Sequence, residues 1–156
     1  MLKYIAIIPA RGGSIGLPRK NVMPLCGKPL IAWNIEAALG SSHVDKVYVT
    51  TDDPEISLVS KVYGACTIER PQELASDTAS SELDLLHALD FLDNRGLLPD
   101  RLVFMQCTSP LTTSLDIDRA IDKLVEQDAD SCFTASNYHH FLWRNNEDGS
   151  AYGINH

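Results

Sequence analysis

Residues 4–21 decide the fold: Tyr-Ile-Ala-Ile-Ile-Pro-Ala-Arg-Gly-Gly-Ser-Ile-Gly-Leu-Pro-Arg-Lys-Asn. The apolar run at 4–8 is typical of a strand that is buried on both faces of a parallel sheet. Glycines and basic residues follow it directly, and ligands bind outside the carboxyl ends of such strands. Glycine lets the backbone approach a ligand closely, while Arg and Lys bind phosphate groups. The stretch therefore predicts an α/β fold with an anion-binding loop after its first strand.

The glycine spacing in this loop argues against two common nucleotide-binding motifs. Gly12, Gly13 and Gly16 fit neither the G-x-G-x-x-G pattern of dehydrogenases nor the G-x-x-x-x-G-K-[ST] loop of ATPases. The alternative interpretation is a glycine-rich turn with exposed bases.

The charge distribution favours a small anionic ligand. The whole chain has a formal net charge of −8, which disfavours nucleic acid as a partner. Residues 1–35 nevertheless contain no acidic residue and five basic ones: Lys3, Arg11, Arg19, Lys20 and Lys28. The composition, 44% hydrophobic and 22% charged, indicates a globular chain, and no apolar stretch is long enough to predict a membrane span or a membrane partner.

Apolar periodicity predicts alternating strands and helices along the rest of the chain. Further strands are expected at 44–49, 65–68, 101–105 and 131–135. Helices are expected between them, with Pro29 in the first turn of the first helix, Asp53 capping the second and Ser114 capping the fourth. Leu39 and Val125 are expected on inward helical faces. This order predicts a three-layer α/β fold with a mainly parallel sheet.

The length of 156 residues predicts one domain, with an α/β core at 1–136 and an irregular tail at 137–156. The tail is expected to form a hairpin turned at Asp148-Gly149. An exposed apolar patch at 141–143 is expected to cause weak self-association. Nothing after the hairpin closes the fold, so the domain 1–156 is predicted to be incomplete.

Cysteine usage bears on the cellular compartment. The four cysteines show neither a C-x-x-C pair nor a metal-ligand spacing, and they are Cys26, Cys66, Cys107 and Cys132. We predict that they are small buried residues rather than a disulfide framework or a zinc site. Since the N-terminus carries no signal-peptide pattern either, a cytoplasmic location is expected.

Three segments of the chain resemble a known family. Residues 8–14 and 17–21 are similar to the signature loop of the CMP-sialic acid synthetases, or acylneuraminate cytidylyltransferases. Arg-Pro-Gln-Glu-Leu-Ala-Ser-Asp-Thr-Ala-Ser-Ser at 70–81 is similar to the second motif of that family, and Gln-Cys-Thr-Ser-Pro-Leu at 106–111 to the third. Thr-Thr-Asp-Asp at 50–53 suits the end of the second strand.

The resemblance covers residues 4–136 and implies a Rossmann-like nucleotide-diphospho-sugar transferase fold. It implies that CTP condenses with a nine-carbon 2-keto acid sugar, a nonulosonic acid, to give a CMP-sugar and pyrophosphate. The implied cofactor is Mg²⁺, and the implied assembly is a homodimer.

The resemblance also implies roles for individual residues. Arg11 and Lys20 would contact the triphosphate as catalytic residues. The implied nucleotide-binding residues are Ala10, Arg11, Gly12, Gly13, Ser14, Lys20, Asn21, Arg70 and Ser81. The implied substrate-binding residues are Gln106, Thr108 and Ser109. Local structure offers alternatives: Arg70 could pair at the surface with Glu69 or Glu73, Ser81 could cap a helix, and 108–110 could be a plain turn.

Two departures from the family leave the reaction open. Ile15 stands where the family loop usually carries a lysine, and neither Arg19 nor Lys28 is expected to replace it. The Asp-x-Asp pair that binds Mg²⁺ in the family belongs to its C-terminal part; here the pattern occurs at Asp116-Ile117-Asp118, in the first turn of an expected helix, where helix-end charge explains it better. We therefore predict no metal ligands in this chain. The alternatives are a nucleotidyltransferase for another sugar and a non-catalytic nucleotide-binding remnant.

Overall fold

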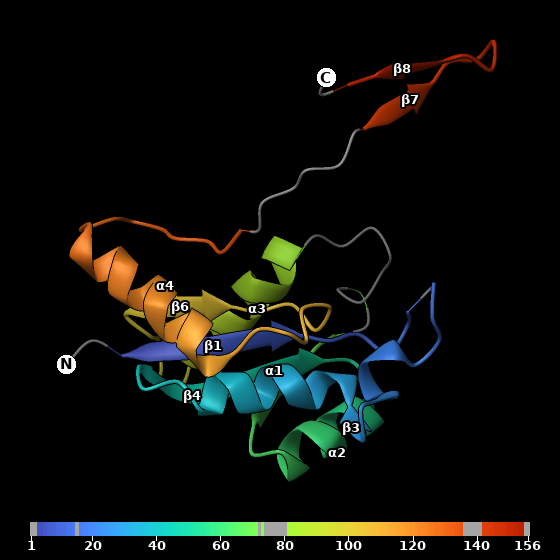
Figure 1. Ribbon diagram of the computed structural model, residues 1–156. Helices are drawn as coiled ribbons and strands as arrows, with labels where there is room; N and C mark the ends of the chain where they lie inside the picture. The colour runs from blue at the N-terminus through green and yellow to red at the C-terminus, as the bar shows by residue number, and fades with distance from the viewer. Residues whose placement is uncertain (1–2, 15, 72, 74–80, 136–141, 155–156) are drawn as a thin grey trace.

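The computed structural model describes residues 3–14, 16–71, 73, 81–135 and 142–154. Its central sheet is parallel and has the strand order β5-β4-β1-β6 (Figure 1). The strands are β1 (Tyr4–Pro9), β4 (Val44–Thr51), β5 (Cys66–Glu69) and β6 (Arg101–Phe104). The main helices are α1 (Leu30–Leu39), α2 (Pro54–Val62), α3 (Ser81–Asp93) and α4 (Ser114–Glu126). The predicted α/β fold with a parallel sheet is confirmed.

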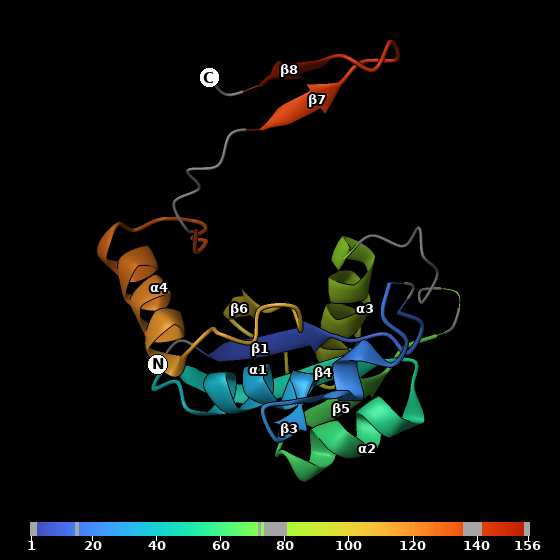
Figure 2. The same cartoon turned by 45° about the vertical axis from the view of Figure 1, so that its right-hand side comes forward.

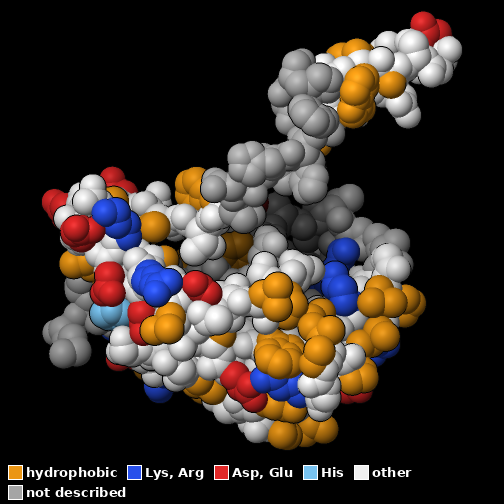
Figure 3. Space-filling model, viewed as in Figure 1, with side chains coloured by type: hydrophobic (Ala, Val, Ile, Leu, Met, Phe, Trp, Pro, Cys, Tyr) orange, Lys and Arg blue, Asp and Glu red, His pale blue; other side chains and the backbone are white. Residues whose placement is uncertain are grey.

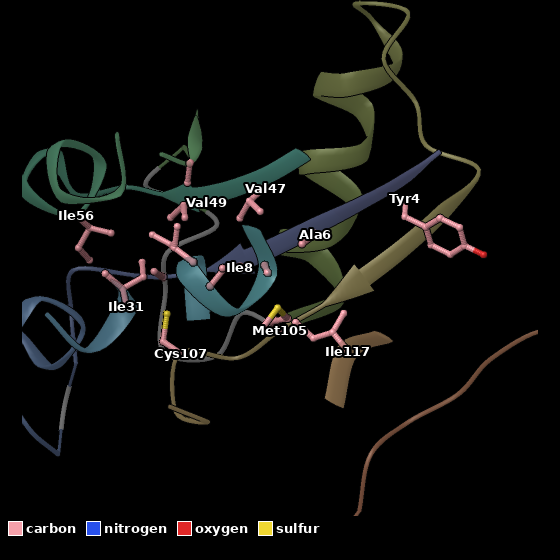
Figure 4. Close-up of a cluster of buried hydrophobic side chains, with 14 of the residues drawn as sticks. Tyr4, Ala6, Ile8, Ile31, Val47, Val49, Ile56, Met105, Cys107 and Ile117 are labelled. Atoms are coloured by element: carbon pink, nitrogen blue, oxygen red, sulfur yellow. The ribbon is translucent and has the colours of Figure 1, made fainter. Parts of the chain in front are cut away.

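Helices cover both faces of the sheet, because the buried side chains of β1 alternate between two clusters. Ile5 and Ile7 pack with Ala88 and Leu92 of α3 on one face. On the other face, α1, α2 and α4 pack against the sheet. Figure 4 shows their residues Ile31, Ile56 and Ile117 beside Ala6 and Ile8 of β1 and Val47 and Val49 of β4. The sheet is therefore the middle layer of three, and Figure 2 shows the helices around it in a second view. None of the helices among the described residues combines the length and apolar character that a membrane span needs.

Some helical residues differ from the sequence-based expectation. Leu39 is 45% exposed and Val125 is 60% exposed, because each lies one position beyond the buried stripe of its helix. Ser114 is the first residue of α4 and not its cap: Thr113 is the N-cap and forms a capping box with Asp116. Pro29 likewise precedes the first helical turn and is the N-cap of α1.

Two further expectations were wrong. Residues 131–135 form no strand, since they have no hydrogen-bonded partner strand, although they lie beside the groove next to β6. Cys107 is buried as expected, but Cys26, Cys66 and Cys132 are exposed; all four thiols are free.

A small unit between the first loop and α1 was not predicted. It consists of the 3₁₀ turn η1 (Lys20–Val22) and the two-residue strands β2 (Pro24–Leu25) and β3 (Lys28–Pro29), which pair antiparallel. Cys26 and Gly27 form the turn between the strands, with positive φ values of 49° and 91°. Hydrophobic side chains gather on the surface around this unit (Figure 3), where Met23 and Leu25 are exposed.

The tail contains the expected hairpin. Strands β7 (Trp143–Asn145) and β8 (Ala151–Gly153) pair antiparallel around a turn that includes Gly149, whose φ is +82°. The two ribbon views show this hairpin apart from the three-layer body (Figures 1 and 2).

Candidate functional site

The candidate site lies at the carboxyl ends of β1 and β6. The chain passes from β1 outward through β4 to β5 and then crosses back to β6 on the other side of β1. In open parallel sheets, ligands bind at the point where the strand order reverses in this way. The two segments that meet there are the glycine loop (residues 10–19) and the turn at residues 106–109.

The body of the protein fixes the start of the glycine loop. The buried Ala10 donates its N–H to the carbonyl of Thr50 at 3.0 Å, and Gly12 donates its N–H to Oδ1 of Asp52 at 3.1 Å. A Cβ atom on Gly12 would lie 2.6 Å from Oδ2 of Asp53, so any other residue would force the Asp53 side chain to move. A Cβ on Gly13 would meet nothing within 4 Å. The loop therefore packs tightly at Gly12 and is open at Gly13, where a ligand can approach the backbone.

Asp53 joins the glycine loop to α2. Its carboxylate accepts hydrogen bonds from the N–H groups of Glu55 and Ile56, both at 2.9 Å, and so caps the helix as predicted. The same carboxylate forms an ion pair with both guanidinium nitrogens of Arg19. Hydrogen bonding from Arg19 is the main cause that holds the pKa of Asp53 below its usual value.

Arg19 and Lys28, two of the five N-terminal bases, form ion pairs with carboxylates of the protein. Arg19, expected to add positive charge for an anion, pairs with Asp53 and Glu55 instead. Lys28 pairs with Glu36 and lies 3.6 Å above the ring centre of Trp33. The expectation that neither replaces a lysine at position 15 agrees with these contacts; Ile15 itself lies outside the described residues.

Lys20 and Asn21 connect the two segments of the site. Asn21 is buried, and its Nδ2 donates to the carbonyl of Arg11 at 3.0 Å, which ties η1 to the glycine loop. Burial raises the pKa of the Cys107 thiol to about 12, and the positive charge of Lys20 opposes that rise. Lys20 thus lies within electrostatic range of the buried Cys107 in the turn at 106–109.

That turn carries the three residues predicted to bind substrate. Gln106, Thr108 and Ser109 are all exposed, and the N–H of Ser109 donates to the carbonyl of Gln106 at 3.1 Å. The buried Cys107 anchors the turn, since its thiol donates to the carbonyl of Pro9 at 3.8 Å. Gln106 and Ser109 line a cavity of about 700 Å³ that continues along β6 and α4, whereas Thr108 does not line it.

Arg70 follows β5 and is buried. Its Nη1 forms an ion pair with Asp84 of α3, and its Nη2 lies 3.7 Å from Oδ1 of Asp52. The alternative of a surface pair with Glu69 or Glu73 is wrong, because the side chain is only 2% exposed and faces these other carboxylates. Ser81, also a predicted nucleotide contact, is the first residue of α3. Asp77 and the histidine pair at 139–140 lie outside the described residues.

The acidic pair at the start of α4 has structural partners. Asp116 completes the capping box, and hydrogen bonds from Thr113 hold its pKa below the usual value. Asp118 accepts hydrogen bonds from Ser41 and Ser42. The two carboxylates therefore serve separate contacts, and the described residues contain no group of three His, Cys, Asp or Glu side chains that could hold a metal ion.

The sequence-based site omitted three residues that shape it. Asp52 and Asp53 hold the glycine loop, whereas the sequence indicated Asp53 only as a helix cap and the segment 50–53 only as the end of a strand. Asn34 of α1 is buried and donates to the carbonyl of Cys107 at 3.4 Å. The two aspartates could have been found from the sequence, because they stand at the carboxyl end of a strand predicted to neighbour the first one. Asn34 could have been found as a polar residue among the apolar residues of a helical face.

Comparison with known proteins places the chain in a family. The family model described as cytidylyltransferase matches residues 5–147. The pseudaminic acid cytidylyltransferase of Campylobacter jejuni (serotype O:23/36) is 35% identical over 92% of this chain and 62% of the relative. The N-acylneuraminate cytidylyltransferase of Escherichia coli O18:K1:H7 is 44% identical over 76% of this chain and 27% of the relative. The chain thus spans less than two thirds of the length of these relatives.

Solved structures agree with this placement. A CMP:2-keto-3-deoxy-manno-octonic acid synthetase complexed with CTP has a TM-score of 0.69 and 27% identity, covering 81% of this chain and 49% of the other. A 4-diphosphocytidyl-2C-methyl-D-erythritol synthase shares the fold, with a TM-score of 0.70 at 14% identity. The match covers 99% of this chain and 69% of the other. With the family model matching most of its length, this chain belongs to the cytidylyltransferase family.

Proposed function

We propose that the chain binds CTP and takes part in the transfer of CMP to a nine-carbon 2-keto acid sugar of the sialic acid type, with release of pyrophosphate. The observation that carries the proposal is the meeting of the glycine loop and the 106–109 turn at the reversal point of the sheet, where the thiol of Cys107 donates to the carbonyl of Pro9 just before the loop. The named relatives support the nucleotide and the acidic class of the sugar.

In the proposed reaction, a hydroxyl oxygen of the sugar forms a bond to the α-phosphorus of CTP. The bond from that phosphorus to the bridging oxygen of the β-phosphate breaks, pyrophosphate leaves with the electron pair, and the hydroxyl proton passes to water. Such a transfer needs charge neutralisation and in-line positioning more than a covalent nucleophile. Arg11 and Lys20 are the residues that would neutralise the phosphates.

The remaining predicted residues divide between the two substrates. Ala10, Gly12, Gly13, Ser14, Asn21, Arg70 and Ser81 are assigned to the nucleotide. Gln106, Thr108 and Ser109 are assigned to the sugar, which would enter from the cavity that Gln106 and Ser109 line. The resemblance to the family also implies Mg²⁺, but the described residues do not fit it. Asp116 and Asp118 are engaged elsewhere, and the second Asp-x-Asp pair, Asp128-Ala129-Asp130, belongs to no described group of three His, Cys, Asp or Glu side chains that could hold a metal ion. No step is assigned to a metal.

Nucleotide binding without turnover is the second candidate. It is favoured by the contacts of Arg19 and Lys28, because both bases are held by carboxylates of the protein and neither supplies the charge that Ile15 lacks. This candidate predicts CTP binding with no release of pyrophosphate.

The test is a calorimetric titration of the chain with CTP, UTP, GTP and ATP in the presence of magnesium, followed by a pyrophosphate-release assay. The assay uses N-acetylneuraminic acid, pseudaminic acid and 2-keto-3-deoxy-manno-octonic acid as acceptors. Selective CTP binding with release on a nine-carbon acid supports the first candidate, and CTP binding alone supports the second. Stronger binding of UTP or GTP would overturn both and indicate a nucleotidyltransferase for another sugar.

A further inference from the structure

Asp52 occupies a position between two parts of the site that are far apart in sequence. It follows the last residue of β4, and its side chain is only 19% exposed. A single carboxylate oxygen, Oδ1, accepts the N–H of Gly12 at 3.1 Å and lies 3.7 Å from Nη2 of Arg70. Asp52 therefore links the glycine loop to the residue that follows β5.

Arg70 is held from a second direction but keeps hydrogen-bonding capacity. Asp84, in the first turn of α3, forms an ion pair with Nη1. Within the described part of the chain, Nε and Nη2 are buried and have no hydrogen-bond partner. A buried guanidinium is stable only where opposite charge compensates it. Asp52 and Asp84 supply that charge. Because Asp52 Oδ1 is 3.7 Å from Nη2 of Arg70, the N–H groups of Nη2 form no hydrogen bond to it.

From this arrangement we propose that Asp52 is a positioning residue, which holds Gly12 and Arg70 at a fixed separation so that both can contact one nucleoside triphosphate. The inference rests on the proposed function, because it requires CTP at the glycine loop. It goes further by assigning the relative placement of two nucleotide contacts to a carboxylate that touches neither the sugar nor the phosphates. Its negative charge orients Arg70 before the nucleotide arrives.

Two substitutions separate the two contacts of Asp52. Asp52→Asn keeps an oxygen that can accept the Gly12 N–H and removes the charge that faces Arg70, whereas Asp52→Ala removes both. We expect CTP binding to weaken in Asp52→Asn, where the charge that faces Arg70 is lost. It should weaken by a further factor of about two to ten in Asp52→Ala, where a net hydrogen-bond contribution is lost as well. CMP binding should change less, because CMP lacks the β- and γ-phosphates.

The matched control is Asp45→Asn. Asp45 lies on the same strand and its Oδ2 also accepts a backbone N–H, that of Tyr4 at 2.8 Å, but near the opposite end of the strand. Calorimetry with CTP and with CMP gives the ratio of the two affinities, which a loss of general stability does not change. Thermal unfolding of each variant without nucleotide shows that it is folded.

The outcomes distinguish the inference from the proposed function. A lowered CTP-to-CMP affinity ratio in both Asp52 variants, with the parent ratio kept in Asp45→Asn, supports the positioning role. The inference is overturned if the parent chain binds CTP and Asp52→Ala has the same CTP-to-CMP affinity ratio as the parent. The proposed function would then stay intact. A folded parent chain that binds no CTP overturns both.

Discussion

The glycine loop and the tail hairpin are held in place by different kinds of contact. The glycine loop bonds to residues far away in sequence, through Ala10 to Thr50 and through Gly12 to Asp52. The recorded hydrogen bonds of the hairpin run within it: Ile154 donates its N–H to the carbonyl of Leu142 at 2.7 Å, and Asn146 bonds to Ser150.

The hairpin is held by contacts between residues near one another in sequence, whereas the glycine loop is held by contacts with distant elements. A hairpin with a suitable turn forms its backbone hydrogen bonds within itself, so we expect its conformation to depend little on the body. The glycine loop takes its shape from β4 and α2, so changes in those elements reach the site. We expect substitutions in the body to affect both stability and nucleotide binding, and substitutions in the hairpin to affect neither.

The largest effect is expected at Ile8, the last apolar residue before the glycine loop. Ile8 is fully buried, and Ile8→Ala should lower the free energy of unfolding by about 2–5 kcal/mol, since it removes buried methyl groups and leaves a cavity. Denaturant unfolding measures the change. Tyr152→Ala in the hairpin is the control and should stay within about 0.5 kcal/mol of the parent. Equal losses in the two variants would show that the hairpin packs on the body.

The next effect concerns binding at Lys20. Lys20→Ala should weaken CTP binding by about ten- to a hundredfold, because a charge-assisted bond to phosphate is worth about 1.5–3 kcal/mol. Lys61→Ala, at an exposed position on α2, is the charge-matched control and should bind CTP like the parent. Arg11→Ala should behave like Lys20→Ala. If all three variants bind equally, the basic N-terminal segment is an ordinary solvated surface and the assignment of the phosphate site fails.

A smaller effect is expected at Asp53, which joins the loop to α2. Asp53→Ala should destabilise the protein by about 0.5–2 kcal/mol through loss of the helix cap. Because the pKa of Asp53 in the folded protein is below its ordinary value of 3.8, its carboxylate stabilises the fold fully above that value. This contribution disappears as the pH falls through the lowered pKa.

The measurement is denaturant unfolding of the parent and Asp53→Asn from pH 6 down to pH 2. Asn can still accept the capping hydrogen bonds, so the difference between the two proteins reports the charge of Asp53. That difference should shrink as the solution becomes more acidic. A difference that stays constant over the range would mean that the ion pair with Arg19 contributes nothing to stability.

Sequence patterns predicted those parts of the molecule whose structure depends on nearby residues. The apolar run at 4–8, the cap at Asp53 and the turn at Asp148-Gly149 are local signals, and all three are confirmed. The expected strand at 131–135 failed because a strand also needs a partner, and periodicity in one segment says nothing about the segment beside it. The β2–β3 unit was missed for the opposite reason: its two-residue strands are too short to show any period.

The same distinction applies to the site. Glycines and bases in one short segment indicated the anion-binding loop, and the motif order indicated the family. Which bases face a ligand depends on contacts between distant residues, and the sequence did not show that Asp53 and Glu55 engage Arg19. The partners of Arg70 were also hidden, because Asp52 and Asp84 come from two different elements that only the folded sheet brings together.

The smallest effect on stability is expected at Trp143, which tests the independence of the hairpin from the other direction. Trp143 is 60% exposed, and Leu142, Tyr152 and Ile154 in the same hairpin are each more than 40% exposed; Phe141, also expected in this patch, lies outside the described residues. Trp143→Ser should change the free energy of unfolding by less than about 0.5 kcal/mol.

Trp143→Ser should nevertheless reduce the weak self-association that exposed apolar side chains promote. Sedimentation velocity over a range of protein concentrations measures this association, and Lys61→Ala serves as a surface control. If the parent and Trp143→Ser sediment identically, the hairpin is not an association surface, and the exposed side chains around η1, β2 and β3 become the next surface to test.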